Sequence, residues 1–182
     1  MKSLLFKRMI MLLSIILGVG LPLFGISDGL AQEKRKLSYA LEKTNYTQQY
    51  VLDVGDVPGH QVRLYEIHRT WPKNPPAFDG VPARDEWMYC YSDYTDINGR
   101  SWGYHHYVLE NGDKVFARFD GTSQTVVTPD GAKKSMFTAV ITLTGGTGKF
   151  RGIQGLARLT ANFDYKANFE EGHVEGEYWI AK

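Results

Sequence analysis

The chain has very little cysteine, almost no net charge and no segment with clear helical periodicity. Cys90 is the single cysteine in 182 residues, so no disulfide can form within one chain, and stability has to come from packing or association. The 21 Lys and Arg residues nearly balance the 20 Asp and Glu residues, which gives no electrostatic reason to expect nucleic acid or an anionic membrane as a partner. Cys90 lies inside a β-patterned run, and we interpret it as a small buried hydrophobic residue rather than a nucleophile.

Residues 1–31 have the pattern of a secretory signal peptide. Lys2, Lys7 and Arg8 precede an almost wholly apolar run, and small residues lead up to a cleavage site expected after Ala31. An uncleaved anchor is the alternative, although the apolar run is barely long enough to span a bilayer. We therefore expect a secreted or periplasmic protein without stable membrane insertion after cleavage. The 151 residues that follow are enough for one domain.

Eight runs rich in β-branched and aromatic residues follow one another after residue 45, separated by turn signals such as Asn98-Gly99 and Asn111-Gly112. The runs are Tyr46–Val54, Gln61–Trp71, Glu86–Tyr94, Ser101–Glu110, Lys114–Asp120, Met136–Thr144, Gly155–Asp164 and His173–Ala181. They predict an all-β domain over 46–182, built as an eight-stranded antiparallel barrel, with a calycin-like barrel or a β-sandwich as the alternative. Residues 32–45 are expected to form a flexible N-terminal segment.

The segment 72–85 interrupts this series with four prolines. Because proline lacks a backbone N–H, we expect the segment to stay out of the sheet as a long ordered loop. Such a loop could act as a lid over the mouth of a barrel, or it could be a surface excursion without a function.

A glycine-dense turn joins two β-patterned runs within 141–163. Its glycines are Gly145, Gly146, Gly148, Gly152 and Gly155. Glycine adopts positive φ angles and allows close backbone approach, so the segment predicts a tight reversal at a barrel corner. A phosphate-binding loop is excluded, because Lys149 is followed by Phe150 instead of Ser or Thr and no helical pattern follows.

The sequence GGTGKFRGIQG in this turn resembles the GGTG-x-F-R-x-A-x-G signature of dirigent proteins and, more loosely, the corresponding turn of plant allene oxide cyclases. The resemblance covers about the last quarter of the chain. It implies an eight-stranded antiparallel barrel, secreted or compartmentalised and often trimeric, with a hydrophobic cavity that binds or cyclises small organic molecules. The matched residues are architectural in those families, so the resemblance assigns no catalytic residue here.

Hairpin register predicts which residues of the central strands share a face. If both Asn-Gly pairs are two-residue type I′ turns, Trp102 lies opposite Thr95 and Val108 lies opposite Val115. One face then carries Trp87, Tyr89, Tyr91, Asp93, Trp102, Tyr104, His106, Val108, Val115, Ala117 and Phe119. We interpret this aromatic face as the wall of a ligand cavity, and the other, also apolar, face as a subunit contact. A slip of one residue would exchange the two faces.

Several ionisable residues accompany the aromatic face. Glu66 and His68 share one face of their run and, if that face points inward, they join Asp93, Tyr91, Tyr104 and His106 around one cavity. Burial would move the pKa values of the carboxylates and imidazoles toward neutrality, with Glu66 or Asp93 as base and His106 or Tyr91 as proton donor. The candidate ligand-binding residues are His68, Trp87, Tyr89, Trp102, Tyr104 and Phe119. The alternative is that the polar groups satisfy one another or lie at the rim.

A metal site of His68, His106 and Glu66 is geometrically conceivable, but the neighbours His105 and His106 point to opposite faces and cannot hold one ion together. We expect no metal and no redox or nucleotide cofactor. The prediction is a secreted barrel that binds a hydrophobic or aromatic small molecule as a homo-oligomer, a trimer or a dimer. Cyclase or isomerase activity by acid–base catalysis is one interpretation of it. The other is a non-catalytic carrier, or a structural subunit of an extracellular assembly.

Overall fold

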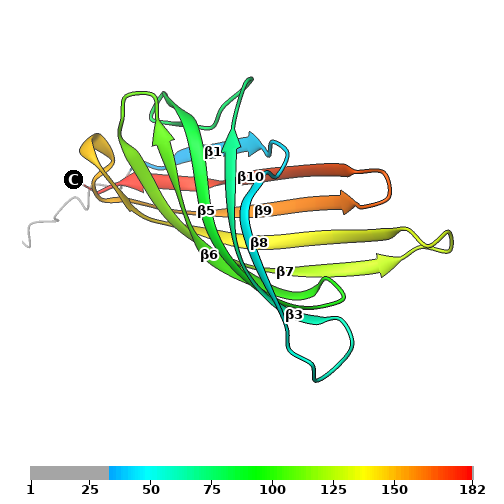
Figure 1. Ribbon diagram of the computed structural model, residues 1–182. Coiled ribbons are helices and arrows are strands. Elements are labelled where there is room, and N and C mark those ends of the chain that lie inside the picture. Colours follow the sequence, from blue (N-terminus) through cyan, green and yellow to red (C-terminus); the bar gives the residue numbers. More distant parts are fainter. Residues whose placement is uncertain (1–32, 182) are drawn as a thin grey trace, which may run out of the picture. The chain divides into compact units, whose positions relative to one another are not determined.

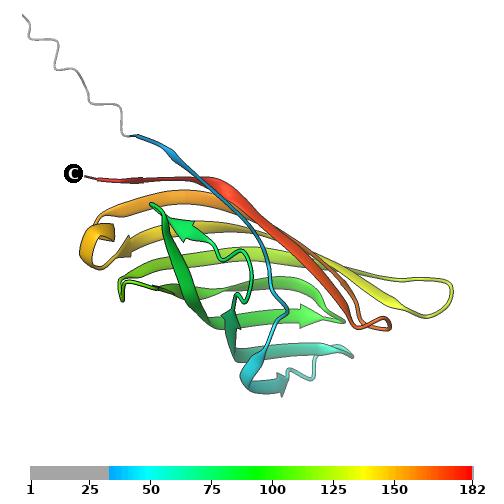
Figure 2. The ribbon, with the colours of Figure 1, turned by 90° about the horizontal axis from the view of Figure 1, so that it is seen from above.

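A computed structural model describes residues 33–181, which form a single antiparallel sheet. The strands are β1 (Arg35–Ala40), β2 (Tyr46–Asp53), β3 (His60–Thr70), β4 (Ala77–Phe78), β5 (Val81–Thr95), β6 (Asn98–Leu109), β7 (Lys114–Val127), β8 (Lys133–Gly146), β9 (Ile153–Asp164) and β10 (Phe169–Ile180). Their order is β1-β10-β9-β8-β7-β6-β5-β3-β2, with β4 beside β5. The sheet is strongly curved (Figures 1 and 2) but does not close, because β1 and β2 lie at its two edges and do not pair with each other. The all-β prediction is confirmed, whereas the strand pairing does not show a closed eight-stranded barrel.

Each of the eight predicted runs lies within one of the long strands from β2 to β10 or extends one residue beyond its end. Two strands were not predicted. β1 lies in the segment expected to be flexible, where Leu37 and Tyr39 alternate with charged and polar residues and are buried beside β10. The expected signal peptide lies outside the described residues. The glycine turn joins β8 to β9 as predicted, through a single 3₁₀ turn (Gly148–Phe150) with positive φ at Gly145, Gly148 and Gly152.

The second strand missed is β4, inside the proline-rich segment. Ala77 and Phe78 pair with Pro82 and Val81, so the expectation that this segment stays out of the sheet is wrong. Proline removes a donor but keeps its carbonyl, and the oxygens of Pro76 and Pro82 accept hydrogen bonds from the backbone N–H groups of Ala83 (2.8 Å) and Glu110 (3.0 Å). The hairpin places Phe78 completely inside the protein.

Phe78 fills one end of the space enclosed by the curved sheet. Its ring contacts those of Tyr107, Phe150 and Tyr178, at centroid distances of 5.1, 6.4 and 5.7 Å. The backbone N–H of Asp79 donates to the Tyr178 hydroxyl at 2.6 Å and fastens the hairpin to β10. This end of the inner space is therefore closed by packing.

Rows of side chains cross the inner face of the sheet, and many of their members are small. One row consists of Arg63, Ser92, Ser101, Gly121, Ala139, Leu159 and Val174, from β3 to β10. A Cβ added at Gly121 would lie 2.5 Å from the Cβ of Ala139, closer than real Cβ contacts allow. Glycine at this position therefore lets neighbouring strands curve tightly around the inner face.

The two predicted hairpin registers are wrong, with different consequences. The β5–β6 turn lies at Asp96-Ile97, both with positive φ, so Trp102 pairs with Tyr91. The observed register differs from the predicted one by an even number of residues. Residues of β5 and β6 that were predicted to share a face therefore still share it. Residues 110–113 join β6 to β7, so Val115 pairs with Tyr107 instead of Val108. This one-residue slip moves Val115, Ala117 and Phe119 to the opposite face, where they are buried.

Candidate functional site

The end of the inner space away from Phe78 holds a cavity of about 410 Å³. Its apolar wall comes from β3, β5, β7, β8 and β9 and consists of Ile67, Met88, Phe119, Phe137, Leu159 and Phe163. The polar wall on β3, β5 and β6 includes Arg63, Tyr65, Cys90, Ser92, Tyr94 and Ser101, and further polar lining comes from the β1–β2 connection and the β9–β10 hairpin, including Lys43, Thr44, Asp164 and Glu170. Apolar walls with a few polar groups are typical of a small-molecule pocket, and the volume lies in the usual range.

Two atoms of the polar wall are buried and have no hydrogen-bond partner. Tyr65 donates its hydroxyl hydrogen to Ser101 Oγ (2.8 Å), which donates to the backbone oxygen of Tyr91 (2.9 Å). Ser92 is completely buried next to this chain, yet its Oγ contacts no donor or acceptor, and neither does Nε of Arg63. An unsatisfied buried polar atom costs about 1–3 kcal/mol, so a partner that bonded to either atom from the cavity would be favourable.

Cys90 lines the same wall. Burial raises the pKa of its thiol to about 12, so the group is a thiol at neutral pH and a poor nucleophile. The interpretation of Cys90 as a small buried hydrophobic residue is confirmed by its 1% exposure. Burial also raises the pKa of Tyr94 to about 12. Both groups therefore act at neutral pH as uncharged parts of the wall.

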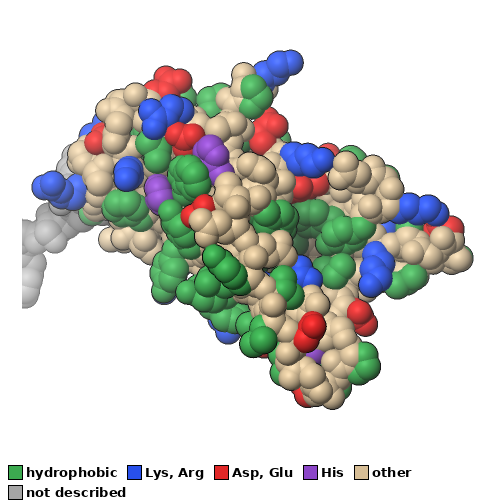
Figure 3. Space-filling view, in the orientation of Figure 1, with side chains coloured by type: hydrophobic (Ala, Val, Ile, Leu, Met, Phe, Trp, Pro, Cys, Tyr) green, Lys and Arg blue, Asp and Glu red, His purple; other side chains and the backbone are tan. Residues whose placement is uncertain are grey.

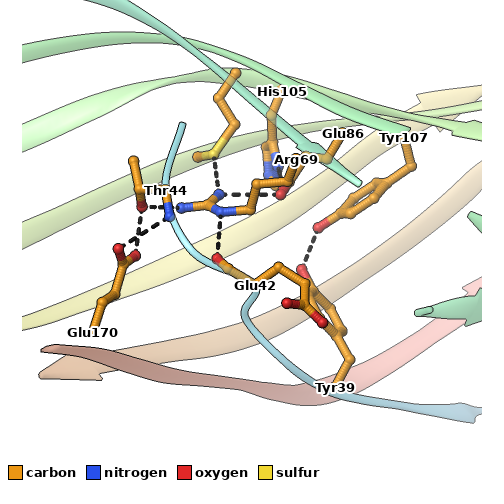
Figure 4. Close-up of polar contacts among 9 residues, drawn as sticks. Tyr39, Glu42, Thr44, Arg69, Glu86, His105, Tyr107 and Glu170 are labelled. Carbon is orange, nitrogen blue, oxygen red and sulfur yellow. Dashed lines mark hydrogen bonds and ion pairs between the residues drawn. The ribbon is translucent and has the colours of Figure 1, made fainter. Parts of the chain in front are cut away.

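Arg69 lines the cavity and is held by a network of polar contacts (Figure 4). Its Nη1 donates to Glu86 Oε2 (3.1 Å) and Met88 Sδ (2.8 Å), its Nη2 to Thr44 Oγ1 (3.0 Å) and its Nε to the backbone oxygen of Glu42 (3.3 Å). Residues 41–45 join β1 to β2, so Arg69 ties the connection between the two sheet edges to β3 and β5.

Glu86 is the buried acid of this network. Its Oε1 lies 2.7 Å from His105 Nδ1, and its other oxygen contacts Arg69. Burial alone would raise the pKa of Glu86, but the hydrogen bond from His105 and the charge of Arg69 outweigh it and hold the pKa below its ordinary value. His105 Nε2 is buried without a partner, against the rings of Tyr107 and Phe119. Neither the imidazole nor Glu86 lines the cavity. Their contacts hold Arg69, which does line it, in place.

The structure brings together nearly all of the site residues predicted from the sequence, but on the outer face of β3, β5 and β6 (Figure 3). The residues placed there are Glu66, His68, Trp87, Tyr89, Tyr91, Asp93, Trp102, Tyr104 and His106. His68 stacks on Trp87 at 4.1 Å between centroids, and Tyr91 stacks on Trp102 at 5.8 Å. None of these nine lines the cavity, so the inward assignment of this face is wrong. Phe119 alone of the predicted set lines it, because of the β6–β7 slip.

Three ionisable members of this outer group, Glu66, His68 and Asp93, have local partners. Thr47 Oγ1 donates to Glu66 (2.5 Å), and His68 Nε2 lies 3.0 Å from Asp85. His60, which was not among the predicted site residues, lies between two carboxylates, with Nδ1 2.6 Å from Asp56 and Nε2 2.8 Å from Asp93. Within residues 33–181 no group of three or more His, Cys, Asp or Glu residues is placed to hold a metal ion.

Sequence reasoning missed Arg69, Glu86, Ser92 and His105 as site residues. The available signal was alternation, since Ser92 and His105 lie on the same face as Met88 and Cys90, the face read as a subunit contact. Arg69 lies near the end of β3, and Glu86 is the first residue of the run predicted from the sequence, so both stand where a charged residue is ordinarily solvated. Their burial depends on partners from β1–β2 and β6, which alternation along one strand cannot reveal.

Comparison of the chain with protein-family models, with curated proteins and with solved structures finds no match. No helix in the part of the chain that the structure describes has the length and apolar character needed to cross a membrane. The assignment of function therefore depends on the site itself.

Proposed function

We propose that the protein binds a hydrophobic or aromatic small molecule in the inner cavity and acts as an exported carrier. The observation that carries the proposal is a pocket of about 410 Å³ in which aromatic and aliphatic walls face two buried polar atoms without partners. Burial of an apolar ligand against such walls provides affinity, and a few polar groups provide orientation. The export signal expected at residues 1–31, and the resemblance of the glycine turn to dirigent proteins and allene oxide cyclases, support the same proposal.

Binding without turnover is the form of the proposal that the site favours. Acid–base catalysis needs a proton donor and an acceptor within reach of the ligand. Glu66, Asp93, His106 and Tyr91 lie on the outer face, away from the cavity. The raised pKa values of Cys90 and Tyr94 keep both lining groups protonated near neutral pH. The two carboxylates of the lining, Asp164 and Glu170, are engaged with Lys134 and Thr44.

Fluorescence titration with N-phenyl-1-naphthylamine, a neutral aromatic probe that brightens in apolar surroundings, tests this proposal. We expect saturable binding of one probe per chain. Leu159→Trp, which fills the cavity from β9, should weaken binding by about tenfold, or ~1.4 kcal/mol. Leu156→Trp is the matched control, because Leu156 lies on the same strand but is exposed on the outer face.

The single cysteine localises the probe without a mutation. Cys90 lines the cavity, so bound probe should slow its modification by a small thiosulfonate, followed by mass at mildly alkaline pH where more thiolate is present. Saturable binding that leaves the labelling rate of Cys90 unchanged, and that Leu159→Trp and Leu156→Trp affect equally, would place the ligand elsewhere and refute the proposal.

We further propose that copies of the chain associate through the outer aromatic face of β5 and β6. Tyr89, Tyr91 and Tyr104 are 44%, 41% and 65% exposed there, a large apolar surface for a chain without disulfides. Arg100 and Asp120 form an ion pair with each other at its rim, so these two residues present no unpaired charge against an identical copy. Sedimentation velocity should show dimers or trimers at micromolar concentration. The double variant Tyr89→Ser/Tyr104→Ser should be monomeric, whereas Tyr50→Ser, on the exposed strand β2, should not change the assembly.

A further inference from the structure

We propose that the cavity selects ligands that carry a carboxylate on an aromatic body, with Arg63 and Ser92 as the residues that bind the carboxylate. This inference rests on the proposed function, because it names the polar group of the molecule that the cavity would hold. It follows from the placement, the unfilled hydrogen bonds and the charge of one wall.

Arg63, Ser92 and Ser101 lie directly opposite one another on three neighbouring strands. Arg63 pairs with Ser92 across β3 and β5, and Ser92 pairs with Ser101 across β5 and β6. All three line the cavity, so one transverse row presents a guanidinium and two hydroxyl groups to the same space. A planar carboxylate could contact a guanidinium and a neighbouring hydroxyl at once.

The hydrogen-bonding capacity of this row is only partly used. Arg63 Nη2 donates to Gln61 Oε1 (2.7 Å), while its Nε is buried without an acceptor. Ser92 Oγ is also buried and has no partner, whereas the Ser101 hydroxyl is engaged with Tyr65 and with the backbone oxygen of Tyr91. A guanidinium offers only donors, so the group that would complete this wall is an acceptor.

The charges of the residues around the cavity also favour an anionic group on the ligand. Among residues 33–181 no carboxylate lies within ion-pair distance of Arg63, while Arg69 is paired with Glu86 at 3.1 Å. The two acidic residues that line the cavity already have partners. Asp164 pairs with Lys134 at 3.3 Å, and Glu170 accepts hydrogen bonds from the Thr44 backbone N–H (3.0 Å) and hydroxyl. The half-buried Arg63 is thus a cation without a counterion, and a ligand carboxylate would neutralise it.

The opposite wall favours an aromatic body. The rings of Phe119 and Phe137 meet edge to face at 6.5 Å, and Phe163 stacks near Tyr165 at 6.2 Å, all four in the lining. Rings arranged in this way offer both faces and edges to a further ring. The cavity therefore combines an aromatic side with an anion-binding side.

Displacement of the neutral naphthylamine probe by a matched pair of competitors, biphenyl-4-carboxylate and biphenyl-4-carboxamide, tests the inference. The two differ in charge and hardly in shape. The native protein should prefer the carboxylate by about tenfold or more, as expected when charge-assisted hydrogen bonds form in a partly buried site. Arg63→Gln should abolish this preference, and Ser92→Ala should reduce it by about threefold. Arg158→Gln is the matched control, since Arg158 is an exposed arginine on the outer face of β9.

Affinity for the neutral probe shows that each variant has kept its cavity. If Arg63→Gln loses probe binding, two other measurements test the inference: the carboxylate preference of Ser92→Ala, and the effect of added salt on the native protein. Salt should weaken binding of the carboxylate and leave binding of the carboxamide unchanged. Equal affinities of the native protein for the two competitors would overturn the inference while leaving the proposed function intact. A native protein that does not bind the probe at all would instead refute the proposed function.

Discussion

The two faces of β5 and β6 are made from the same strands, yet the outer face carries most of the aromatic rings and the inner face is the buried one. His105 and His106 show the contrast between neighbours. His105 is 3% exposed and hydrogen-bonded to the buried Glu86, whereas His106 lies on the outer face and stacks near Tyr89 at 6.1 Å. The inner face holds its buried acid, Glu86, between His105 and Arg69. The outer face keeps its ionisable groups among partly exposed rings.

The comparison shows that aromatic content does not identify the buried face. The outer face carries large rings whose edges stay in contact with solvent. The inner face carries several residues with little or no side chain, such as Gly103 and Ser101, because a curved sheet leaves less room inside than outside. Small residues at alternate positions were therefore a better sign of the inner face than rings.

The largest difference between the faces should come from their acids. Glu86→Gln removes the charge that Arg69 and His105 share and leaves Arg69 buried without a counterion, which should lower the free energy of unfolding by about 3–5 kcal/mol. Glu66→Gln, on the outer face, should cost less than about 1 kcal/mol because its carboxylate contacts Thr47 near solvent. Urea unfolding measures both changes, and equal losses would show that the inner network is not what distinguishes the faces.

The adjacent histidines should show the same contrast at a smaller scale. His105→Ala leaves Glu86 without one of its hydrogen bonds and opens a gap beside Tyr107, so we expect a loss of about 2–3 kcal/mol. His106→Ala should change the free energy of unfolding by about 1 kcal/mol at most. A larger loss for His106 than for His105 in thermal or urea unfolding would contradict the assignment of the faces.

The smallest effect should be a pH dependence confined to the outer face. The hydrogen bonds from His60 to Asp93 and Asp56 raise the pKa of His60, so they hold the β2–β3 connection most firmly when the imidazole is protonated. This stabilisation is fully present below the ordinary pKa of histidine, about 6.5, and is lost as the pH rises through the raised value.

Hydrogen exchange can detect this loss at the backbone N–H groups of Val54 and His60, which bond to residues of the same connection. After correction for intrinsic exchange rates, their protection should fall between mildly acidic and mildly alkaline pH in the native protein. His60→Gln should be insensitive to pH over that range. Glu86 itself should stay ionised over that range, because its pKa is lowered.

The sequence by itself determined the all-β class, the eight long strands, the reversal at the glycine turn and the sorting of β5 and β6 residues into two groups. These features depend on local preferences and on alternation, both of which can be read along one strand. It also brought Glu66, His68 and seven aromatic or ionisable neighbours correctly into one cluster.

Only the tertiary structure decided which of the two groups faces inward, because alternation is unchanged when a strand is turned over. The tertiary structure also placed Phe119 on the inner face. The connection between β6 and β7 covers residues 110–113, and its length, which sets the register, is not specified by the Asn-Gly pair. The fold also buried Arg69, Glu86 and His105, since charged groups can be buried only where partners from other strands compensate them. The same holds for β1, whose Leu37 and Tyr39 are covered by residues far away in the chain.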